Sequence, residues 1–268
     1  MPAKSKLGQN FLRDEGAIAR IGAALGNVSE QTVLEIGPGE GVITRALIER
    51  AGHVTAIEVD HELAIALRAY FPSEKLAVIE QDVLQFDFAA AAAAAGHKLA
   101  VVGNLPYYIT SPILLKLAEN HASLDRAVLM VQREVADRIV AEPGSRDYGV
   151  LSVTVQMYGP VERLFTLPPG AFSPPPEVHS TVFRWRFAPR FAELGVSEKG
   201  FIQFAKQIFA QKRKTLANNL RAAGLEPAVV QAAFAETGIS PQARAESLGL
   251  PELARLHAHL ENKKAATL

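Results

Sequence analysis

The sequence predicts an α/β protein in which a doubly wound, mostly parallel sheet is followed by a small all-α domain. Through the first two-thirds of the chain, short apolar runs rich in β-branched residues alternate with amphipathic stretches of helical period. The runs are followed by Gly, Asp or Asn, as is typical of buried parallel strands. Beyond residue 197 the pattern is helical throughout. We therefore expect a boundary near residue 189, between domains of residues 1–188 and 189–268.

Five apolar runs are expected to form the parallel strands, because each is only four to six residues long and carries no polar alternation. They lie at residues 32–36, 53–58, 76–79, 99–102 and 127–131. Amphipathic patterns between them predict helices at residues 41–50, 61–70 and 111–120. Seven consecutive alanines at residues 89–95 are interpreted as a helix or loop without chemistry.

The pattern changes after Gly149. Residues 150–157, 161–165 and 181–187 are interpreted as strands, and the alternation in the last of them predicts antiparallel strands that close the sheet. Residues 189–197 are expected to form a linker. Helices are then expected near residues 201–209, 227–236 and 251–261.

Composition excludes several classes of protein. With 49% hydrophobic and 21% charged residues among 268, the chain is neither disordered in bulk nor fibrous. It has no cysteine, so disulfides, thiolate zinc sites, iron–sulfur clusters and cysteine nucleophiles are excluded. No apolar run reaches the ~18 residues of a membrane span, and the N-terminus lacks the apolar segment of a signal peptide. A cytoplasmic protein with no membrane partner is expected.

Charge is balanced overall but unevenly distributed. The chain has 28 basic and 28 acidic residues. From Pro189 to the end there are 11 basic and 7 acidic residues, so the tail carries a net +4 and the preceding part a net −4. A basic tail domain on an acidic body indicates contact with an anionic polymer.

A glycine-rich turn follows the first expected strand, in the sequence Glu35-Ile-Gly37-Pro-Gly39-Glu-Gly41. Glycine lets the backbone turn sharply and approach a ligand without a Cβ atom in the way. A dinucleotide site would have its third glycine at position 42, which is valine here. The spacing therefore favours a nucleoside-like ligand without a diphosphate, and S-adenosylmethionine over NAD.

Carboxylates end the next two expected strands. Glu58 lies 21 residues after Gly37, where an acidic residue accepts hydrogen bonds from the ribose hydroxyls of an adenosine ligand. NAD sites share this feature, so Glu58 alone does not choose between the cofactors. Asp82, followed by Val83, ends the third strand, where its carboxylate can accept from an adenine amino group or cap a turn.

The tetrapeptide Asn104-Leu105-Pro106-Tyr107 ends the fourth expected strand, at the sheet edge where open α/β folds place their sites. The amide oxygen of Asn104 and the carbonyl of Leu105 can both accept from an exocyclic amine and orient it for an in-line attack. Pro106 lacks an N–H and is expected to turn the carbonyls of the loop toward the substrate. Tyr107 offers a ring on which a base can stack.

These motifs resemble the ribosomal RNA adenine N6-dimethyltransferases, and the resemblance covers nearly the whole chain. Lys6-Leu-Gly-Gln-Asn10-Phe-Leu12 is similar to the N-terminal element of that family that folds over the cofactor. The segment from Phe172 to Ser180 matches its F-x-P-x-P-x-V-x-S motif. Residues 209–220 resemble its basic segment, and residues 244–248 its closing R-x-E-x-L element. Two departures are Glu40 after the second glycine and Gln211 at the start of the basic segment.

The resemblance implies a Rossmann-like, S-adenosylmethionine-dependent methyltransferase without a metal. It implies SN2 transfer of two methyl groups to each of two adjacent adenosines in the 3′-terminal hairpin loop of 16S rRNA, within the immature (pre-30S) small subunit. The enzyme is expected to be a monomer. The expected base-contacting residues are Asn104, Leu105, Pro106, Tyr107 and Phe172, the last lying across the adenine from Tyr107. The expected cofactor residues are Asn10, Leu12, Gly37, Gly39, Glu58, Asp82, Val83 and Asn104, and the expected rRNA contacts are Lys212, Arg213 and Lys214.

Two alternatives remain on the same scaffold. One is the antibiotic-resistance type of enzyme, which dimethylates one adenine of large-subunit rRNA; the C-terminal segments favour the small-subunit enzyme over it. The other is a non-catalytic ribosome-assembly factor, against which Asn104 and the intact glycine turn argue.

Overall fold

The computed structural model describes residues 10–265, with side chains to Glu261, and its contacts divide the chain into two compact units. Unit 1 comprises the chain up to Ala136 together with Val161–Phe187, and unit 2 comprises Asp137–Pro160 together with the chain from Ala188. The last of the three changes of unit, between Phe187 and Ala188, lies one residue from the expected boundary. Residues 137–160 belong to unit 2 by their contacts, although the sequence placed them in the first domain. A single boundary in sequence cannot describe a chain that leaves a unit and returns to it.

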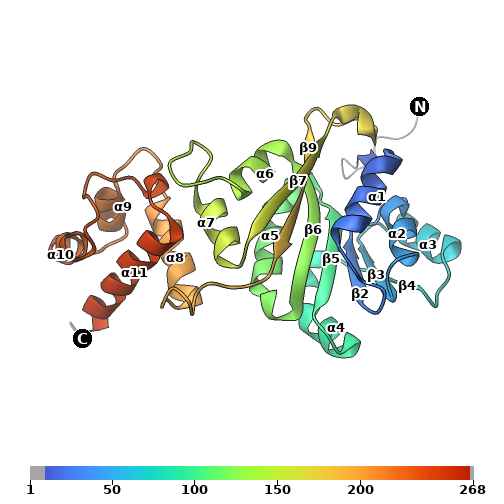
Figure 1. The fold of residues 1–268 in the computed structure, drawn as a ribbon, viewed down its shortest axis with the longest axis horizontal. Helices are drawn as coiled ribbons and strands as arrows, with labels where there is room; N and C mark the ends of the chain where they lie inside the picture. Colours follow the sequence, from blue (N-terminus) through green and yellow to red (C-terminus); the bar gives the residue numbers. More distant parts are fainter. Residues whose placement is uncertain (1–9, 266–268) are drawn as a thin grey trace. The chain divides into compact units, whose positions relative to one another are not determined.

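Unit 1 is built on a seven-stranded sheet of order β4-β3-β2-β5-β6-β9-β7 (Figure 1). Its parallel pairs are β2 with β3, β3 with β4, β2 with β5, and β5 with β6, whereas β9 runs antiparallel to both β6 and β7. The strands are β2 Thr32–Ile36, β3 His53–Glu58, β4 Leu76–Glu80, β5 Leu99–Asn104, β6 Leu124–Gln132, β7 Val161–Leu167 and β9 Ser180–Arg186. The order reverses between β2 and β5, so a crevice opens at their carboxyl ends.

Helices connect the parallel strands as the alternating pattern predicts. They are α2 Val42–Ile48, α3 His61–Tyr70, α4 Phe88–Ala95 over the alanine run, and α5 Thr110–Glu119; α1 Glu15–Ala24 precedes the sheet. Ile21 of α1 and Leu47 of α2 pack on the sheet face that carries Val33, Val102 and Val128. Because each strand alternates its side chains, Leu34 and Val101 lie on the opposite face, and both are fully buried. Both faces are thus covered, as the continuous apolar runs require.

One element was predicted with the wrong type. Residues 150–157, interpreted as a strand, form α7 Val150–Met157, and all but two of its residues are buried. The hydroxyl of Ser152 accepts from the amide of Gly149 and donates to the carbonyl of Arg138, which fixes the first turn of the helix. A helix buried on nearly every side shows no amphipathic period, so a short apolar run does not distinguish it from a strand.

A second, two-stranded sheet was not predicted. It pairs β1 Phe11–Leu12 with β8 Phe172–Ser173 in antiparallel register. Two residues are too few to produce a recognisable alternation. The ribbon joins the N-terminal segment to the proline-rich segment that precedes β9.

Unit 2 is helical, as expected. Besides α7 it contains α8 Glu198–Ile208, α9 Leu216–Ala222, α10 Pro227–Thr237 and α11 Leu250–Ala265; α6 Arg133–Ile139 spans the change of unit. Residues 189–197 contain no helix or strand, in agreement with the expected linker. The three cations of the basic segment, however, are not part of a helix: Lys212, Arg213 and Lys214 lie in the turn between α8 and α9. Within residues 10–265, no helix is long and apolar enough to cross a membrane.

Candidate active site

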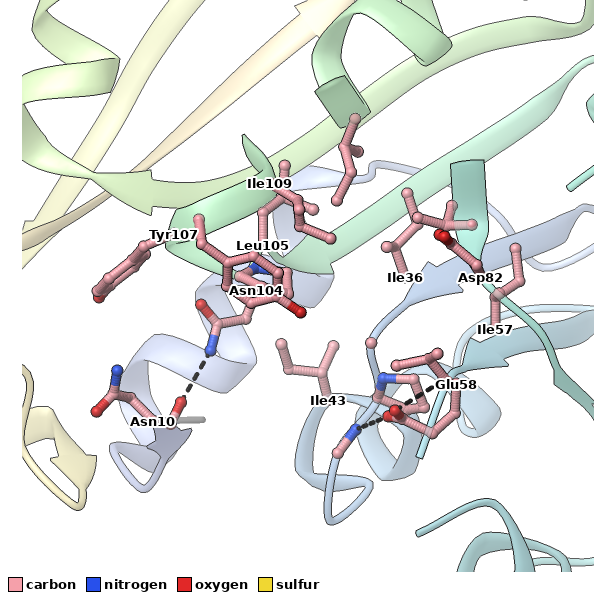
Figure 2. A pocket seen from close by; sticks show the side chains of 18 of the residues that line it. Asn10, Ile36, Ile43, Ile57, Glu58, Asp82, Asn104, Leu105, Tyr107 and Ile109 are labelled. Carbon is pink, nitrogen blue, oxygen red and sulfur yellow. Dashed lines mark hydrogen bonds between the residues drawn. The ribbon is translucent and has the colours of Figure 1, made fainter. Parts of the chain in front are cut away.

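A cavity of ≈ 450 Å³ lies at the carboxyl ends of β2, β3, β4 and β5, at the reversal of strand order. Each of these strands contributes lining residues just beyond its last residue, and the N-terminal segment lines another side (Figure 2). The predicted site residues that line it are Asn10, Leu12, Gly37, Gly39, Glu58, Asp82, Val83, Asn104, Leu105, Pro106 and Tyr107. The structure therefore brings together residues that are up to 97 positions apart in the chain.

The glycine turn adopts the conformation that its sequence suggests. Gly37, Gly39 and Gly41 have φ angles of 64°, 57° and 78°, a backbone region that residues other than glycine rarely adopt. A Cβ atom on Gly39 would lie 2.9 Å from the ring of Phe11, and one on Gly41 would lie 2.6 Å from the ring of Phe71. Gly41 thus allows the ring of Phe71 to pack closely against the backbone, a packing role that the third glycine has in a dinucleotide site. Gly37 and Gly39 line the cavity.

Glu58 is 3% exposed and lies at the end of β3 with its carboxylate held by three backbone amides. One oxygen accepts from Gly39 at 3.1 Å, and the other accepts from Val59 at 2.9 Å and Asp60 at 3.0 Å. Because each carboxylate oxygen can accept more than one hydrogen bond, the oxygen facing Gly39 retains capacity for a ligand. These bonds also connect β3 to the glycine turn, so Glu58 orients two walls of the cavity.

Asp82 and Val83 line the cavity at the end of β4. One oxygen of Asp82 accepts from the amide of Leu84 at 2.9 Å and caps the 3₁₀ turn Val83–Gln85. The cap and a ligand contact are compatible, because the capping bond uses one of the two carboxylate oxygens. Val83 is buried and presents an apolar surface beside it.

Asn104 ends β5, and its amide nitrogen donates to the carbonyl of Asn10 at 3.1 Å. Figure 2 shows the nitrogen directed at Asn10 and the amide oxygen turned away from it. The bond fixes which end of the amide is the acceptor in the cavity. Both residues line that cavity, so the N-terminal segment positions the side chain that the sequence assigned to the chemistry.

The turn after Asn104 is fixed at several points. The amide of Leu105 donates to Met130 on β6 at 3.0 Å. The carbonyl of Pro106 accepts from the hydroxyl of Thr110 at 3.0 Å and from the amide of Ile109 at 3.2 Å. This carbonyl therefore points into the turn, whereas the sequence predicted that it faces the substrate. The hydroxyl of Tyr107 lies 2.8 Å from that of Ser180 on β9, and burial raises the pKa of Tyr107, which keeps it a neutral phenol.

The structure does not place Phe172 at the cavity. Phe172 is 4% exposed and packs in the core with Leu12, its partner across the β1–β8 ribbon. The expected adenine slot between Phe172 and Tyr107 stays a prediction. Of the N-terminal element, residues 6–9 lie outside the described residues, whereas Asn10 and Leu12 line the cavity.

Sequence reasoning assigned no contact to two further residues. The departure Glu40 forms an ion pair of 2.7 Å with Arg13, which connects the glycine turn to the residue after β1. Glu35 is fully buried beneath the turn and accepts from the hydroxyl of Thr44 at 2.6 Å. Burial, reinforced by the nearby charge of Glu58, raises the pKa of Glu35 to about 7. Neither contact has a local sequence signal, since both depend on how the chain folds back.

The basic turn in unit 2 is braced by Asn219, which is buried in α9. Its side-chain oxygen accepts from the amide of Gln211 at 3.1 Å, and its nitrogen donates to the carbonyl of Gln211 at 3.2 Å. Lys212, Arg213 and Lys214 follow directly and are exposed. The ammonium group of Lys212 donates to the carbonyl of Arg146 at 2.5 Å.

Among the described residues, no three His, Asp or Glu side chains gather closely enough to hold a metal ion. What the cavity offers is a glycine cradle, an anchored carboxylate and an oriented amide oxygen beside an aromatic ring. Such a set suits an adenosine-containing ligand and, next to it, a planar group with an exocyclic amine.

Comparison with known proteins agrees with this chemistry. The family model for ribosomal RNA adenine dimethylase matches residues 2–261. A ribosomal RNA small subunit methyltransferase A from Acidobacterium capsulatum is 57% identical over 261 residues, covering 97% of this chain and 92% of that protein. The protein of the same name from Koribacter versatilis is 48% identical over 269 residues, covering 96% and 94%.

Two solved structures have the same fold over nearly the whole chain. A dimethyladenosine transferase from Plasmodium falciparum superposes with a TM-score of 0.81 at 22% identity, covering 95% of this chain and 98% of that one. The 23S rRNA methyltransferase ErmE superposes with a TM-score of 0.71 at 27% identity, covering 94% and 100%.

Proposed function

Because the chain belongs to the ribosomal RNA adenine dimethylase family, we propose that it transfers methyl groups from S-adenosylmethionine to N6 of adenosines in small-subunit rRNA. The observation that carries the proposal is the orientation of Asn104, whose amide nitrogen is bound to Asn10 and whose oxygen is left as the acceptor in the cavity. The names of the relatives at 57% and 48% identity support the small subunit as the substrate.

The cavity fits the cofactor. Gly37 and Gly39 provide a surface without Cβ atoms, and a Cβ on Gly39 would collide with Phe11. Glu58 would accept from the ribose hydroxyls, Asp82 from the adenine amino group, and Val83 would pack against the base. Asn10 and Leu12 would close the remaining side. When bound, S-adenosylmethionine supplies a methyl group on a cationic sulfur, which is electrophilic without help from a metal.

The residues of the β5 end would orient the acceptor amine. The lone pair of an exocyclic amine is delocalised into the ring, so the amine is a poor nucleophile until it is held out of conjugation. The amide oxygen of Asn104 and the carbonyl of Leu105 would accept its two hydrogens and direct the lone pair at the methyl group. The ring of Tyr107 would support the base by stacking. The amine would attack as a neutral group, and the sulfur would leave as a neutral thioether. The methylated nitrogen would then release its proton to water, so no general base is required before transfer.

The finer statements about substrate also belong to this proposal. We propose that the acceptors are two adjacent adenosines in the 3′-terminal hairpin loop of 16S rRNA, each dimethylated within an immature small subunit. Loop adenosines are unpaired, so their extrusion into a pocket costs less than extrusion from a duplex. Lys212, Arg213 and Lys214 would contact rRNA phosphates. Such a substrate places the enzyme in the cytoplasm, and we propose that it acts as a monomer.

The likeness to ErmE supports one alternative, methylation of large-subunit rRNA. Transfer of tritiated methyl groups to immature small subunits, naked small-subunit rRNA and naked large-subunit rRNA tests the choice. We expect label in the immature subunits, as N6,N6-dimethyladenosine after digestion. Label confined to naked large-subunit rRNA would reverse the assignment, and no label in any substrate would contradict the methyltransferase proposal.

A further inference from the structure

Tyr107 is attached to the protein at both ends of its side chain. At the backbone, it begins the 3₁₀ turn Tyr107–Ile109, which is closed by hydrogen bonds to the carbonyl of Pro106. At the far end of the ring, its hydroxyl lies 2.8 Å from the hydroxyl of Ser180. A tyrosine held only by its backbone could still rotate about two side-chain bonds. The second attachment removes that freedom.

Ser180 is a rigid anchor. It is fully buried and begins β9, where it pairs with Gln132 of β6 on one side and Leu167 of β7 on the other. A strand bonded on both sides has little local freedom. The ring of Tyr107 therefore spans from the end of β5 to the antiparallel part of the sheet and forms one fixed wall of the cavity.

We propose that Ser180 is a positioning residue for methyl transfer, which holds the plane of the Tyr107 ring in the orientation that the target base needs for stacking. This inference rests on the proposed function, because it presupposes that Tyr107 supports the base. It assigns a role to the final serine of the segment that begins at Phe172. It also separates the two properties of Tyr107: the ring supplies the stacking surface, and the hydroxyl fixes its angle.

The proposal predicts a specific kinetic pattern. Loss of either hydroxyl should misalign the base in the bound complex, so it should lower kcat with immature small subunits by about three- to tenfold, the range for one neutral hydrogen bond. KM for the subunits should change little, since phosphate contacts elsewhere dominate binding. The affinity for cofactor should also stay the same, because neither hydroxyl is assigned to it.

A double-mutant cycle tests this coupling with Ser180→Ala, Tyr107→Phe and the double variant. Thr181→Val is the matched control: Thr181 is the adjacent buried residue of β9, and its hydroxyl bonds to Thr166 at 2.9 Å, not to Tyr107. We expect both single variants to lose kcat, the double variant to lose no more than the worse single one, and Thr181→Val to retain the kcat of the parent. Melting temperatures show that each variant is folded at the assay temperature.

Several outcomes would overturn the proposal. One is a kcat of Ser180→Ala within about twofold of that of the parent. Another is a loss of kcat in Thr181→Val that equals the loss in Ser180→Ala. A third is that the losses of kcat multiply in the double variant, which would mean that the two hydroxyls act independently. A raised KM for cofactor with unchanged kcat would assign Ser180 to the cofactor pocket instead. If the unmodified protein transfers no methyl group to any rRNA, the proposed function fails first, and the parent assay shows that separately.

Discussion

The side-chain nitrogen of Asn104 donates a hydrogen bond to the backbone carbonyl of Asn10, 94 residues earlier in the chain, at 3.1 Å. The bond connects the end of β5 to the N-terminal segment beside β1. Because an amide has one donating and one accepting end, committing the nitrogen to Asn10 determines that the oxygen is the acceptor available in the cavity. The orientation on which the proposed chemistry depends is thus set by the N-terminal segment.

Asn104→Ala should lower kcat by ~10²–10³, the loss typical of one preorganised polar group at a reacting centre. The cofactor affinity should fall far less than kcat: Asn104 borders the cofactor and holds Asn10, but Glu58 and the glycine turn are unchanged. Turnover is measured with saturating rRNA substrate and cofactor, so that weak binding cannot be mistaken for slow chemistry. Turnover within a few-fold of the parent would make Asn104 a turn residue only.

Asn104→Asp serves as the matched variant for that experiment. Aspartate keeps an acceptor oxygen, but a carboxylate cannot donate to the carbonyl of Asn10 and would repel it. We expect at most partial recovery of turnover relative to Asn104→Ala. Full recovery would show that the bond to Asn10 does not matter for orientation.

Glu58→Ala should weaken cofactor binding more than it slows transfer at saturating cofactor. Two charge-assisted hydrogen bonds to the ribose, each worth ~1.5–3 kcal/mol, correspond to a loss of about two to four orders of magnitude in affinity. Calorimetric titration with S-adenosylmethionine measures it. Since Glu58 also accepts from Gly39, Val59 and Asp60, the melting temperature of the unliganded variant must be recorded. An unchanged affinity would remove Glu58 from the site.

Glu35 should make the free energy of unfolding depend on pH. Its pKa is raised by burial to about 7 in the folded protein, from an ordinary value of 4.5. Between these values the folded state binds more protons than the unfolded state, so the contribution of Glu35 to stability is fully present below pH 4.5 and is lost as the pH rises through 7. The loss amounts to about 3 kcal/mol at most.

Glu35→Gln should remove this component, because glutamine can still accept from Thr44 but carries no proton that titrates. The measurement is chemical denaturation of the parent and the variant between pH 5 and pH 8, where the stability difference should change in favour of the variant as the pH rises. Glu74→Gln, which removes an exposed carboxylate, is the control. Parallel pH profiles for the parent and Glu35→Gln would contradict the prediction.

The parts of the fold that could be predicted are those whose signal is local. The central strands β2 and β3 were predicted with their observed ends, because a buried parallel strand is a short apolar run that ends at a glycine or a polar residue. Helix α7 was predicted wrongly, since burial on nearly every side removes the helical period. The basic turn at Lys212 was placed in a helical segment because its neighbours are helical.

The site could be predicted where residues follow strand ends, because parallel strands bring their carboxyl ends to one edge. Glu58, Asp82 and Asn104 line one cavity for that reason. The contact between Tyr107 and Ser180 could not be predicted, because it joins the end of β5 to β9 over 73 residues of sequence and across the intervening strand β6. The burial of Phe172 likewise follows from its pairing with Leu12, a ribbon that leaves no pattern in the sequence.

Replacing Lys212, Arg213 and Lys214 together with alanine should weaken rRNA binding and flatten its salt dependence. The slope of log affinity against log salt should fall by ~0.7–0.9 for each phosphate contact removed. Filter binding at several salt concentrations measures the slope. Lys199→Ala with Lys206→Ala, two exposed lysines of α8, is the control for loss of charge alone. An unchanged slope and affinity would mean that the turn is merely solvated.

Asn219→Ala should weaken rRNA binding without removing any charge. Asn219 holds both the amide and the carbonyl of Gln211, so its loss frees the residue that begins the basic turn and leaves two backbone groups without those partners. The buried position adds a stability cost of about 1–3 kcal/mol, to be followed by denaturation. In binding assays at a temperature where the variant is folded, we expect lower affinity with nearly the salt slope of the parent, because the three cations remain.

Asn219→Asp should have an intermediate rRNA affinity, since it keeps the acceptor for the Gln211 amide and loses the donor. Equal rRNA affinity for all three proteins would show that the turn is ordered without Asn219, and a slope reduced as far as in the triple alanine variant would show that the asparagine acts on the phosphate contacts themselves.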